Sequence, residues 1–306
     1  MSANIVEVED LRKSYGSLEA VRGISFTVSE GQVFALLGPN GAGKTTTVEI
    51  LEGFRRRSGG SVSVLGFDPA TGDRRLKQQM GIVLQTTGVD PYLTVAETVD
   101  MFRGYYPKPR ARADVIRLVG LEDKSRERVT KLSGGQRRRL DVAIALAGDP
   151  RVLFLDEPTT GFDPGAKRNA WDVIKDLAGL GKTIFLTSHS MDEVQFLADT
   201  VLIIAGGKVV AEGTPSSLIS RKDSPTLIRF RVPAGLALPD SLRDSMRTDE
   251  TGVELETMDP TRTLYELTSW AVKNEIALDG LQVTRPSLED VYLQITKEAD
   301  AKGSTA

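Results

Sequence analysis

The chain has 306 residues, of which 40% are hydrophobic and 26% charged, and its formal net charge is -3. This composition is typical of a soluble globular protein with one large domain and a smaller one, and it gives no general attraction to nucleic acid. The absence of cysteine excludes disulfides and thiolate chemistry. No apolar run approaches the roughly 18–20 residues that span a bilayer, and the N-terminus lacks a secretory signal, so we expect any membrane part to be another polypeptide.

Short apolar runs predict a parallel sheet in the first part of the chain. An alternating segment, 24–28, predicts an antiparallel strand ahead of that sheet. The runs that read as strands buried on both faces are 33–37, 152–155, 183–186 and 201–204. The first three end in a glycine-rich loop, an acidic pair and Ser188-His189. Because ligands bind at the carboxyl ends of parallel strands, we expect these three segments to converge on one site.

The rest of the chain adds a helical region and a small second domain. Between about 90 and 148 the pattern is helical. A composition shift near 214–225 leads us to expect one domain over 1–220 and an α+β accessory domain over 221–306. The elements expected in that second domain are a strand at 227–230, a helix at 263–274, a strand at 281–283 and a helix that opens at Ser287. The last six residues are expected to be frayed.

The glycine-rich loop follows an apolar strand and opens a helix. Its residues are Gly38, Pro39, Asn40, Gly41, Ala42, Gly43, Lys44, Thr45 and Thr46. Glycines let backbone N–H groups point around a phosphate, and the helix N-terminus adds positive potential. We expect the ammonium of Lys44 to bind the β- and γ-phosphates of ATP and the hydroxyl of Thr45 to coordinate Mg²⁺. The alternative is a flexible turn with a solvated lysine.

Asp156 and Glu157 stand at the end of another apolar strand. Carboxylates at a buried sheet edge are unfavourable unless a cation or a polar reactant is near. We expect Asp156 to be the Mg²⁺ partner and Glu157 to orient or deprotonate the water that attacks the phosphate. An acidic pair of this kind, taken alone, is often an ordinary solvated loop.

The pentapeptide Leu132, Ser133, Gly134, Gly135 and Gln136 lies between these two halves of a phosphate site. Small residues at a helix N-terminus can form a second anion-binding end, although a plain Ser N-cap followed by flexible glycines is the other interpretation. The order of loop, pentapeptide and acidic pair resembles that of the nucleotide-binding subunits of ABC transporters, over roughly residues 4–220. That resemblance implies an α/β P-loop NTPase core with an antiparallel β subdomain and an inserted helical subdomain.

The resemblance also implies roles for residues that mean little alone. In such ATPases the pentapeptide of one chain closes over the nucleotide held by another, which implies a homodimer with Ser133 and Gly135 facing the γ-phosphate and with Asp163 in a loop that crosses the interface. His189 corresponds to the residue that senses the γ-phosphate, although a lone histidine is more often structural. Gln85 corresponds to a contact of Mg²⁺ and the attacking water. Tyr15 corresponds to the aromatic that stacks on adenine.

The function that follows is an ATPase that powers separate membrane-spanning permease subunits from the cytoplasmic face of the membrane. The C-terminal segment resembles that of daunorubicin-type exporters, so we expect export of drug-like or lipid-linked compounds. One alternative is a soluble mechanochemical ABC ATPase that acts on ribosomes or DNA, and another is a catalytically silent scaffold. The arginine runs 55–57 and 137–139 lack interleaved aromatics, which favours solvated surface and no nucleic acid.

Overall fold

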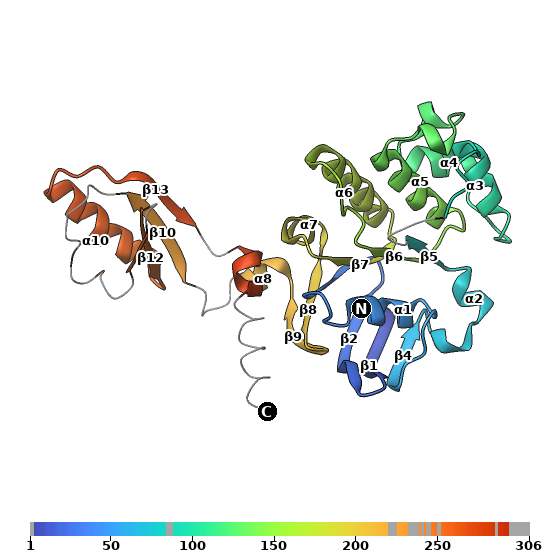
Figure 1. Ribbon diagram of the computed structural model, residues 1–306, viewed down its shortest axis with the longest axis horizontal. Helices are drawn as coiled ribbons and strands as arrows, with labels where there is room; N and C mark the ends of the chain where they lie inside the picture. Colours follow the sequence, from blue (N-terminus) through green and yellow to red (C-terminus); the bar gives the residue numbers. More distant parts are fainter. Residues whose placement is uncertain are drawn as a thin grey trace. The chain divides into compact units, whose positions relative to one another are not determined.

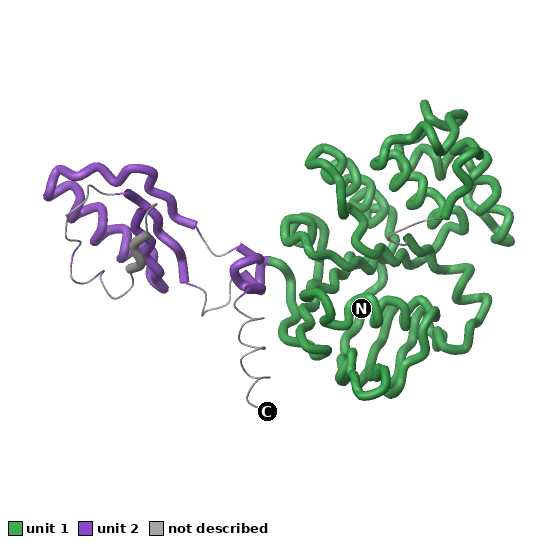
Figure 2. The backbone as a smooth tube through the Cα atoms, viewed as in Figure 1, with its two compact units in different colours: residues 1–215, 295–306 green, residues 216–294 purple. Residues whose placement is uncertain are grey.

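The computed structural model describes residues 3–83, 88–219, 225–231, 239, 242, 246–249, 252–284 and 287–293. Backbone contacts divide the chain into two compact units (Figure 2). The first is Met1–Pro215 with Ile295–Ala306, and the second is Ser216–Gln294. The expected domain boundary at 220/221 stays a prediction.

The first unit is built on a six-stranded sheet with the order β5-β6-β7-β3-β8-β9 (Figure 1). Its strands are β3 (Val33–Leu37), β5 (Met80–Val83), β6 (Val152–Asp156), β7 (Thr183–Ser188), β8 (Thr200–Ala205) and β9 (Lys208–Gly213). All neighbours pair in parallel except β9, which runs antiparallel to β8. The predicted parallel sheet is confirmed, and its order makes β6, β7 and β3 adjacent, so the segments that follow them leave the same edge of the sheet.

A three-stranded antiparallel sheet lies beside this core, with the order β2-β1-β4. Its strands are β1 (Asn4–Tyr15), β2 (Leu18–Ser29) and β4 (Gly59–Val64). Phe26 of β2 stacks on Phe34 of β3 with ring centroids 5.3 Å apart, and Phe34 stacks in turn on Phe185 of β7 at 5.3 Å. Stacked aromatics of this kind add to the free energy of burial, so they fix the antiparallel sheet against the strands that carry the site.

Helices fill the connections between the core strands. The α-helices of the first unit are α1 (Lys44–Leu51), α2 (Arg74–Lys77), α3 (Val95–Arg103), α4 (Arg112–Leu118), α5 (Gly134–Leu146), α6 (Pro164–Gly179) and α7 (Met191–Leu197), and the 3₁₀ turns are η1 (Pro69–Thr71), η2 (Glu122–Lys124) and η3 (Val129–Lys131). The helices α3, α4 and α5 gather away from the antiparallel sheet, as the expected helical subdomain (Figure 1). None of the helices in the described part of the chain is long and apolar enough to cross a membrane.

In its described residues, the second unit contains a four-stranded antiparallel sheet with the order β11-β12-β10-β13 and one long helix. Its elements are α8 (Pro215–Ile219), β10 (Thr226–Arg231), β11 (Met246–Asp249), β12 (Gly252–Thr257), α10 (Pro260–Lys273), β13 (Asp279–Thr284) and a short helix over 288–293. The expected strand, helix, strand and final helix are present, whereas β11 and β12 were missed. Ser287 and Asp290 cap the final helix reciprocally, because each backbone N–H bonds the other's side chain.

Candidate active site

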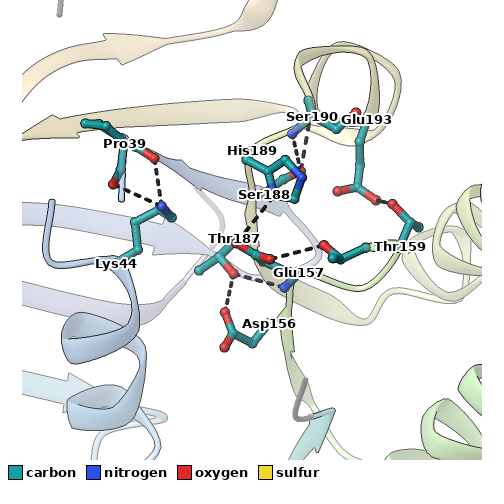
Figure 3. A network of polar contacts seen from close by, with 12 residues as sticks. Pro39, Lys44, Asp156, Glu157, Thr159, Thr187, Ser188, His189, Ser190 and Glu193 are labelled. Atoms are coloured by element: carbon teal, nitrogen blue, oxygen red, sulfur yellow. Dashed lines mark hydrogen bonds and ion pairs between the residues drawn. The ribbon is translucent and has the colours of Figure 1, made fainter. Parts of the chain in front are cut away.

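The glycine-rich loop joins β3 to α1, and its lysine is turned inward. Lys44 is 8% exposed, and its ammonium donates hydrogen bonds to the carbonyls of Gly38 at 2.7 Å and Pro39 at 3.2 Å (Figure 3). Burial lowers the pKa of Lys44, and the carboxylates of Glu157 and Asp156 partly oppose that change. The loop therefore holds a cation at the edge of the sheet, within electrostatic reach of the acidic pair.

Two glycines in this loop are required by close backbone approaches. A Cβ on Gly38 would lie 2.5 Å from the carbonyl oxygen of Ile204 in β8. Gly43 has a φ of 101°, and a Cβ there would lie 2.6 Å from the carbonyl oxygen of Ala20 in β2. The loop is thus packed tightly against both sheets, which fixes its shape before a ligand binds.

Asp156 ends β6 and lies in register with Thr187 of β7. The hydroxyl of Thr187 donates to Oδ1 of Asp156 and accepts a hydrogen bond from the backbone N–H of Glu157 at 3.1 Å (Figure 3). One hydroxyl therefore orients both members of the acidic pair. Sequence reasoning missed Thr187, although a hydroxyl that directly follows the apolar run 183–186 was the available signal.

Glu157 has a left-handed backbone, with a φ of 45°. For a residue with a side chain this conformation costs roughly 1–2 kcal/mol, so the contacts around Glu157 must hold it in place. Its carboxylate accepts a hydrogen bond from Thr160 Oγ1 at 3.1 Å, and its Oε1 lies 3.4 Å from Nδ1 of His189. The structure thus brings together the predicted base and the predicted γ-phosphate sensor from the ends of β6 and β7.

A buried carboxylate behind His189 connects α7 to the segment that follows β6. Glu193 is 1% exposed, and its Oε1 accepts hydrogen bonds from Thr159 Oγ1 at 2.7 Å and from Trp171 Nε1 at 3.0 Å. Figure 3 shows Glu193 and Thr159 beside Glu157 and His189. Sequence reasoning missed this link, since a glutamate near the start of a helix normally reads as an exposed residue.

The pentapeptide begins α5. Ser133 is the N-cap: its hydroxyl accepts a hydrogen bond from the N–H of Gln136 at 3.3 Å, while the Gln136 side chain accepts one from the N–H of Ser133 at 3.0 Å. Leu132 is buried, and Gly134 and Gly135 form the first turn. Capping uses a lone pair of the Ser133 hydroxyl and not its hydrogen, so that hydrogen can still be donated to an anion.

The arginine runs are solvated surface only in part, because Arg138 is buried while Arg56 and Arg137 are exposed. Arg138 is only 8% exposed, and it donates hydrogen bonds to backbone carbonyls next to the acidic pair. In the first run, Arg57 binds both carboxylate oxygens of Asp68 at 2.8 Å. Arg138 differs from its neighbours because it lies on the side of α5 that faces the segment after β6.

Tyr15 and Asp163 make contacts of their own outside this cluster. Tyr15 ends β1, and its ring lies under the cations of Lys13 and Arg55, at 5.0 and 5.3 Å from the ring centroid. Asp163 caps α6 by accepting a hydrogen bond from Ala166 N at 2.9 Å. Gln85 lies outside the described residues. The roles expected for all three stay predictions.

The donors at the site fit Mg²⁺ better than a transition metal. The predicted ligands Thr45 and Asp156 would supply a hydroxyl and a carboxylate, and hard oxygen donors of this kind suit Mg²⁺. Among the residues that the structure describes, no three His, Cys, Asp or Glu side chains gather as a metal site.

Glu52, directly after α1, is a buried carboxyl that predicts an unusual pH dependence. It is 3% exposed, its Oε1 has no hydrogen-bond partner, and burial, together with the charges of Asp156 and Glu49, raises its pKa from 4.5 to about 8. Between these two pH values the folded chain holds a proton that the unfolded chain releases. The free energy of unfolding therefore falls as the pH rises through this window, by up to about 1.4 kcal/mol per pH unit.

We expect Glu52→Gln to remove this penalty. Between pH 5 and pH 7.5, the free energy of unfolding of the native chain should fall by about 3 kcal/mol more than that of the variant. The reason is that the amide of the variant has no proton to lose. Urea unfolding at the two pH values measures the difference, with Glu19→Gln on the exposed surface as the matched control. Parallel pH profiles for the native and Glu52→Gln proteins would show that Glu52 is already ionised in the folded chain.

Comparisons with known proteins agree with this geometry. Residues 21–160 match the ABC transporter family, and residues 226–287 match the C-terminal domain of ABC transporter domain-containing protein-like proteins. The chain is similar to the Nod factor export ATP-binding protein I of Ralstonia nicotianae, with 37% identity over 96% of this chain and 94% of the relative. It is also similar to the linearmycin resistance ATP-binding protein LnrL of Bacillus subtilis, with 34% identity over 95% of this chain and 98% of the relative.

Solved structures show the same fold. The cbiO1 protein of Clostridium perfringens, part of the ABC transporter complex cbiONQ, matches with a TM-score of 0.65 and 28% identity over 72% of this chain and 92% of that chain. A dimeric ATP-binding cassette bound to ADP and Pi matches with a TM-score of 0.61 and 24% identity over 68% of this chain and 98% of that chain. Since the sequence relatives match at 37% and 34% identity along almost their whole length, the chain belongs to the ABC transporter family as an ATP-binding, ATP-hydrolysing subunit.

Proposed function

We propose that the chain powers an exporter by binding Mg·ATP between two copies of itself and hydrolysing it at the edge of the parallel sheet. The observation that carries the catalytic part is the meeting of a buried lysine, a hydroxyl-bonded acidic pair and a histidine at the ends of three adjacent strands. The proteins that match along the whole chain are named for Nod factor export and for linearmycin resistance. These names support the proposal of a drug-like or lipid-linked cargo.

Each group in the cluster has a role that its position supports. Lys44 and the loop N–H groups bind the phosphates. Thr45 and Asp156, with Gln85 by resemblance, would hold Mg²⁺, which when bound neutralises phosphate charge. Glu157 accepts the proton of the attacking water, and His189, 3.4 Å away, orients that carboxylate and contacts the γ-phosphate. Tyr15 is proposed to stack on the adenine ring.

The argument for a dimer rests on the N-terminus of α5, which is a second helix end able to bind an anion. Ser133 and Gly135 begin α5, which has no lysine of its own at its N-terminus, so we infer that they complete the nucleotide site of a second chain. Asp163 would lie in the loop at that interface. Two chains closing over two ATP molecules would then drive membrane-spanning permease subunits, with this chain peripheral at the cytoplasmic face of the membrane.

The mechanochemical alternative has less support. Relatives that match along the whole chain are export and resistance ATP-binding proteins, and the second unit matches a C-terminal domain found with ABC transporter domains. A role on ribosomes or DNA would leave that unit unexplained. A silent scaffold would not require Lys44, Asp156, Glu157 and His189 together.

Purification of the tagged full chain from solubilised membranes tests the proposal. We expect a stoichiometric partner whose sequence contains several apolar segments of about 20 residues. Addition of that partner in lipid vesicles should raise the ATPase rate of the chain, and the Lys44→Ala chain serves as the inactive control. Recovery of ribosomal proteins or nucleic acid with no membrane protein would favour the mechanochemical alternative.

A further inference from the structure

Arg138 differs from the other arginines of its run because its guanidinium is buried against the backbone on either side of Glu157. It lies on α5, two residues after the pentapeptide, and it is 8% exposed. Its Nε donates a hydrogen bond to the carbonyl of Pro158 at 3.1 Å, and its Nη2 donates one to the carbonyl of Asp156 at 3.0 Å. On its own helix, Nη1 lies 3.8 Å from Oδ2 of Asp141.

The two carbonyls that Arg138 binds flank a single residue, Glu157. That residue has the left-handed backbone described above, with a φ of 45°. Its N–H is held from the other side by the carbonyl and the hydroxyl of Thr187, at 3.2 and 3.1 Å. The strained residue is therefore fixed between a strand of the sheet and an arginine from the pentapeptide helix.

The neighbouring arginines make a different kind of contact. Arg137 donates a hydrogen bond to the carbonyl of Thr130 at 3.2 Å, and Arg139 donates one to the carbonyl of Gly120 at 3.4 Å. Both of these hydrogen bonds lie within the helical region. The planar, permanently charged guanidinium of Arg138 binds the two carbonyls through a rigid fork of donors. A lysine would keep the charge but would lose that fork.

We propose that Arg138 is a positioning residue: it holds Glu157 in its reactive orientation and links that orientation to the pentapeptide helix. This inference rests on the proposed function, in which Glu157 is the base and the pentapeptide contacts the ATP of the partner chain. When α5 of one chain contacts the ATP held by its partner, Arg138 stabilises Glu157 of its own chain. That Glu157 acts on the ATP held by its own chain. The result is positive cooperativity between the two sites.

The test compares four full-length chains: native, Arg138→Lys, Arg138→Gln and, as the matched control, Arg139→Gln. We expect both Arg138 variants to lose kcat by up to about 10²-fold, because a small displacement of the base is sufficient for a loss of that size. KM for ATP should change little, and the Hill coefficient should fall towards 1. Arg138→Lys should keep a native melting temperature, since its buried cation remains. Arg139→Gln should keep native kinetics.

The outcomes separate this inference from the function on which it rests. If Arg138→Lys has native kcat and cooperativity, or if its loss only equals that of Arg139→Gln, the positioning role is wrong even where Glu157→Gln is inactive. If Glu157→Gln itself retains full activity, the assignment of the base has failed instead. A poorly folded Arg138→Gln chain leaves the decision to Arg138→Lys, which keeps a positive charge at the buried position and removes the guanidinium fork.

Discussion

Glu157→Gln is expected to bind ATP normally and to lose about 10²- to 10⁴-fold in kcat, the usual contribution of a general base. The substitution keeps the shape of the side chain and leaves the backbone bonds to Thr187 and Arg138 in place. An amide cannot accept the proton of the attacking water at neutral pH. Binding without turnover should therefore accumulate a closed dimer with ATP trapped inside, which gel filtration with and without ATP would detect.

A matched control for this variant is Glu127→Gln. Glu127 is exposed in the helical region and pairs only loosely with Lys131, at 4.0 Å, so the same chemical change there should leave the rate native. Steady-state phosphate release measures both variants. A native kcat in the Glu157→Gln chain would remove Glu157 from the catalytic role and leave the acidic pair with Mg²⁺ binding alone.

Lys44→Ala is expected to fail at the earlier step, by weakening ATP binding. The ammonium is buried in the loop and is held by the carbonyls of Gly38 and Pro39, so it is positioned before the phosphates arrive. A hydrogen bond to a charged group contributes about 1.5–3 kcal/mol, which corresponds to a rise in Kd of about 10- to 150-fold. Titration with a fluorescent ATP analogue measures this change.

Lys77→Ala provides the comparison for Lys44→Ala, because Lys77 is exposed on α2 and is not part of the loop. Both proteins should keep native melting temperatures, which separates a binding defect from misfolding. An unchanged Kd in Lys44→Ala would mean that the backbone N–H groups alone bind the phosphates.

The sequence predicted four of the five parallel strands and the site edge, because these depend on local patterns, whereas β5 was not predicted as a strand. Continuous apolar runs gave β3, β6, β7 and β8, and the adjacency of β6, β7 and β3 brings Glu157 and His189 together, as expected for strand ends on one edge. The paired strands β11 and β12 were missed, although Val253 and Leu255 alternate with polar residues in β12. Their apolar pattern is short, and short patterns are weak signals.

The contacts that orient the site could not be read in the same way, since they join residues far apart in the chain. Thr187 meets Asp156 only through strand register, and Arg138 meets the carbonyl of Pro158 only once α5 lies against the segment that follows β6. Glu193 likewise becomes a buried acceptor only when α7 approaches Trp171 of α6. Each of these side chains is polar. From residue type alone, we would expect each of them to be exposed to solvent.

The most direct measurement of the shared-site account is ATP hydrolysis by a mixture of two inactive chains, Ser133→Arg and Lys44→Ala. In a mixed dimer, the native loop of the first chain faces the native pentapeptide of the second, so one site of the two is intact. We therefore expect the mixture to hydrolyse ATP faster than either variant alone. If the pentapeptide acted within its own chain, every site in the mixture would be defective, and a mixture as inactive as its components would contradict the account.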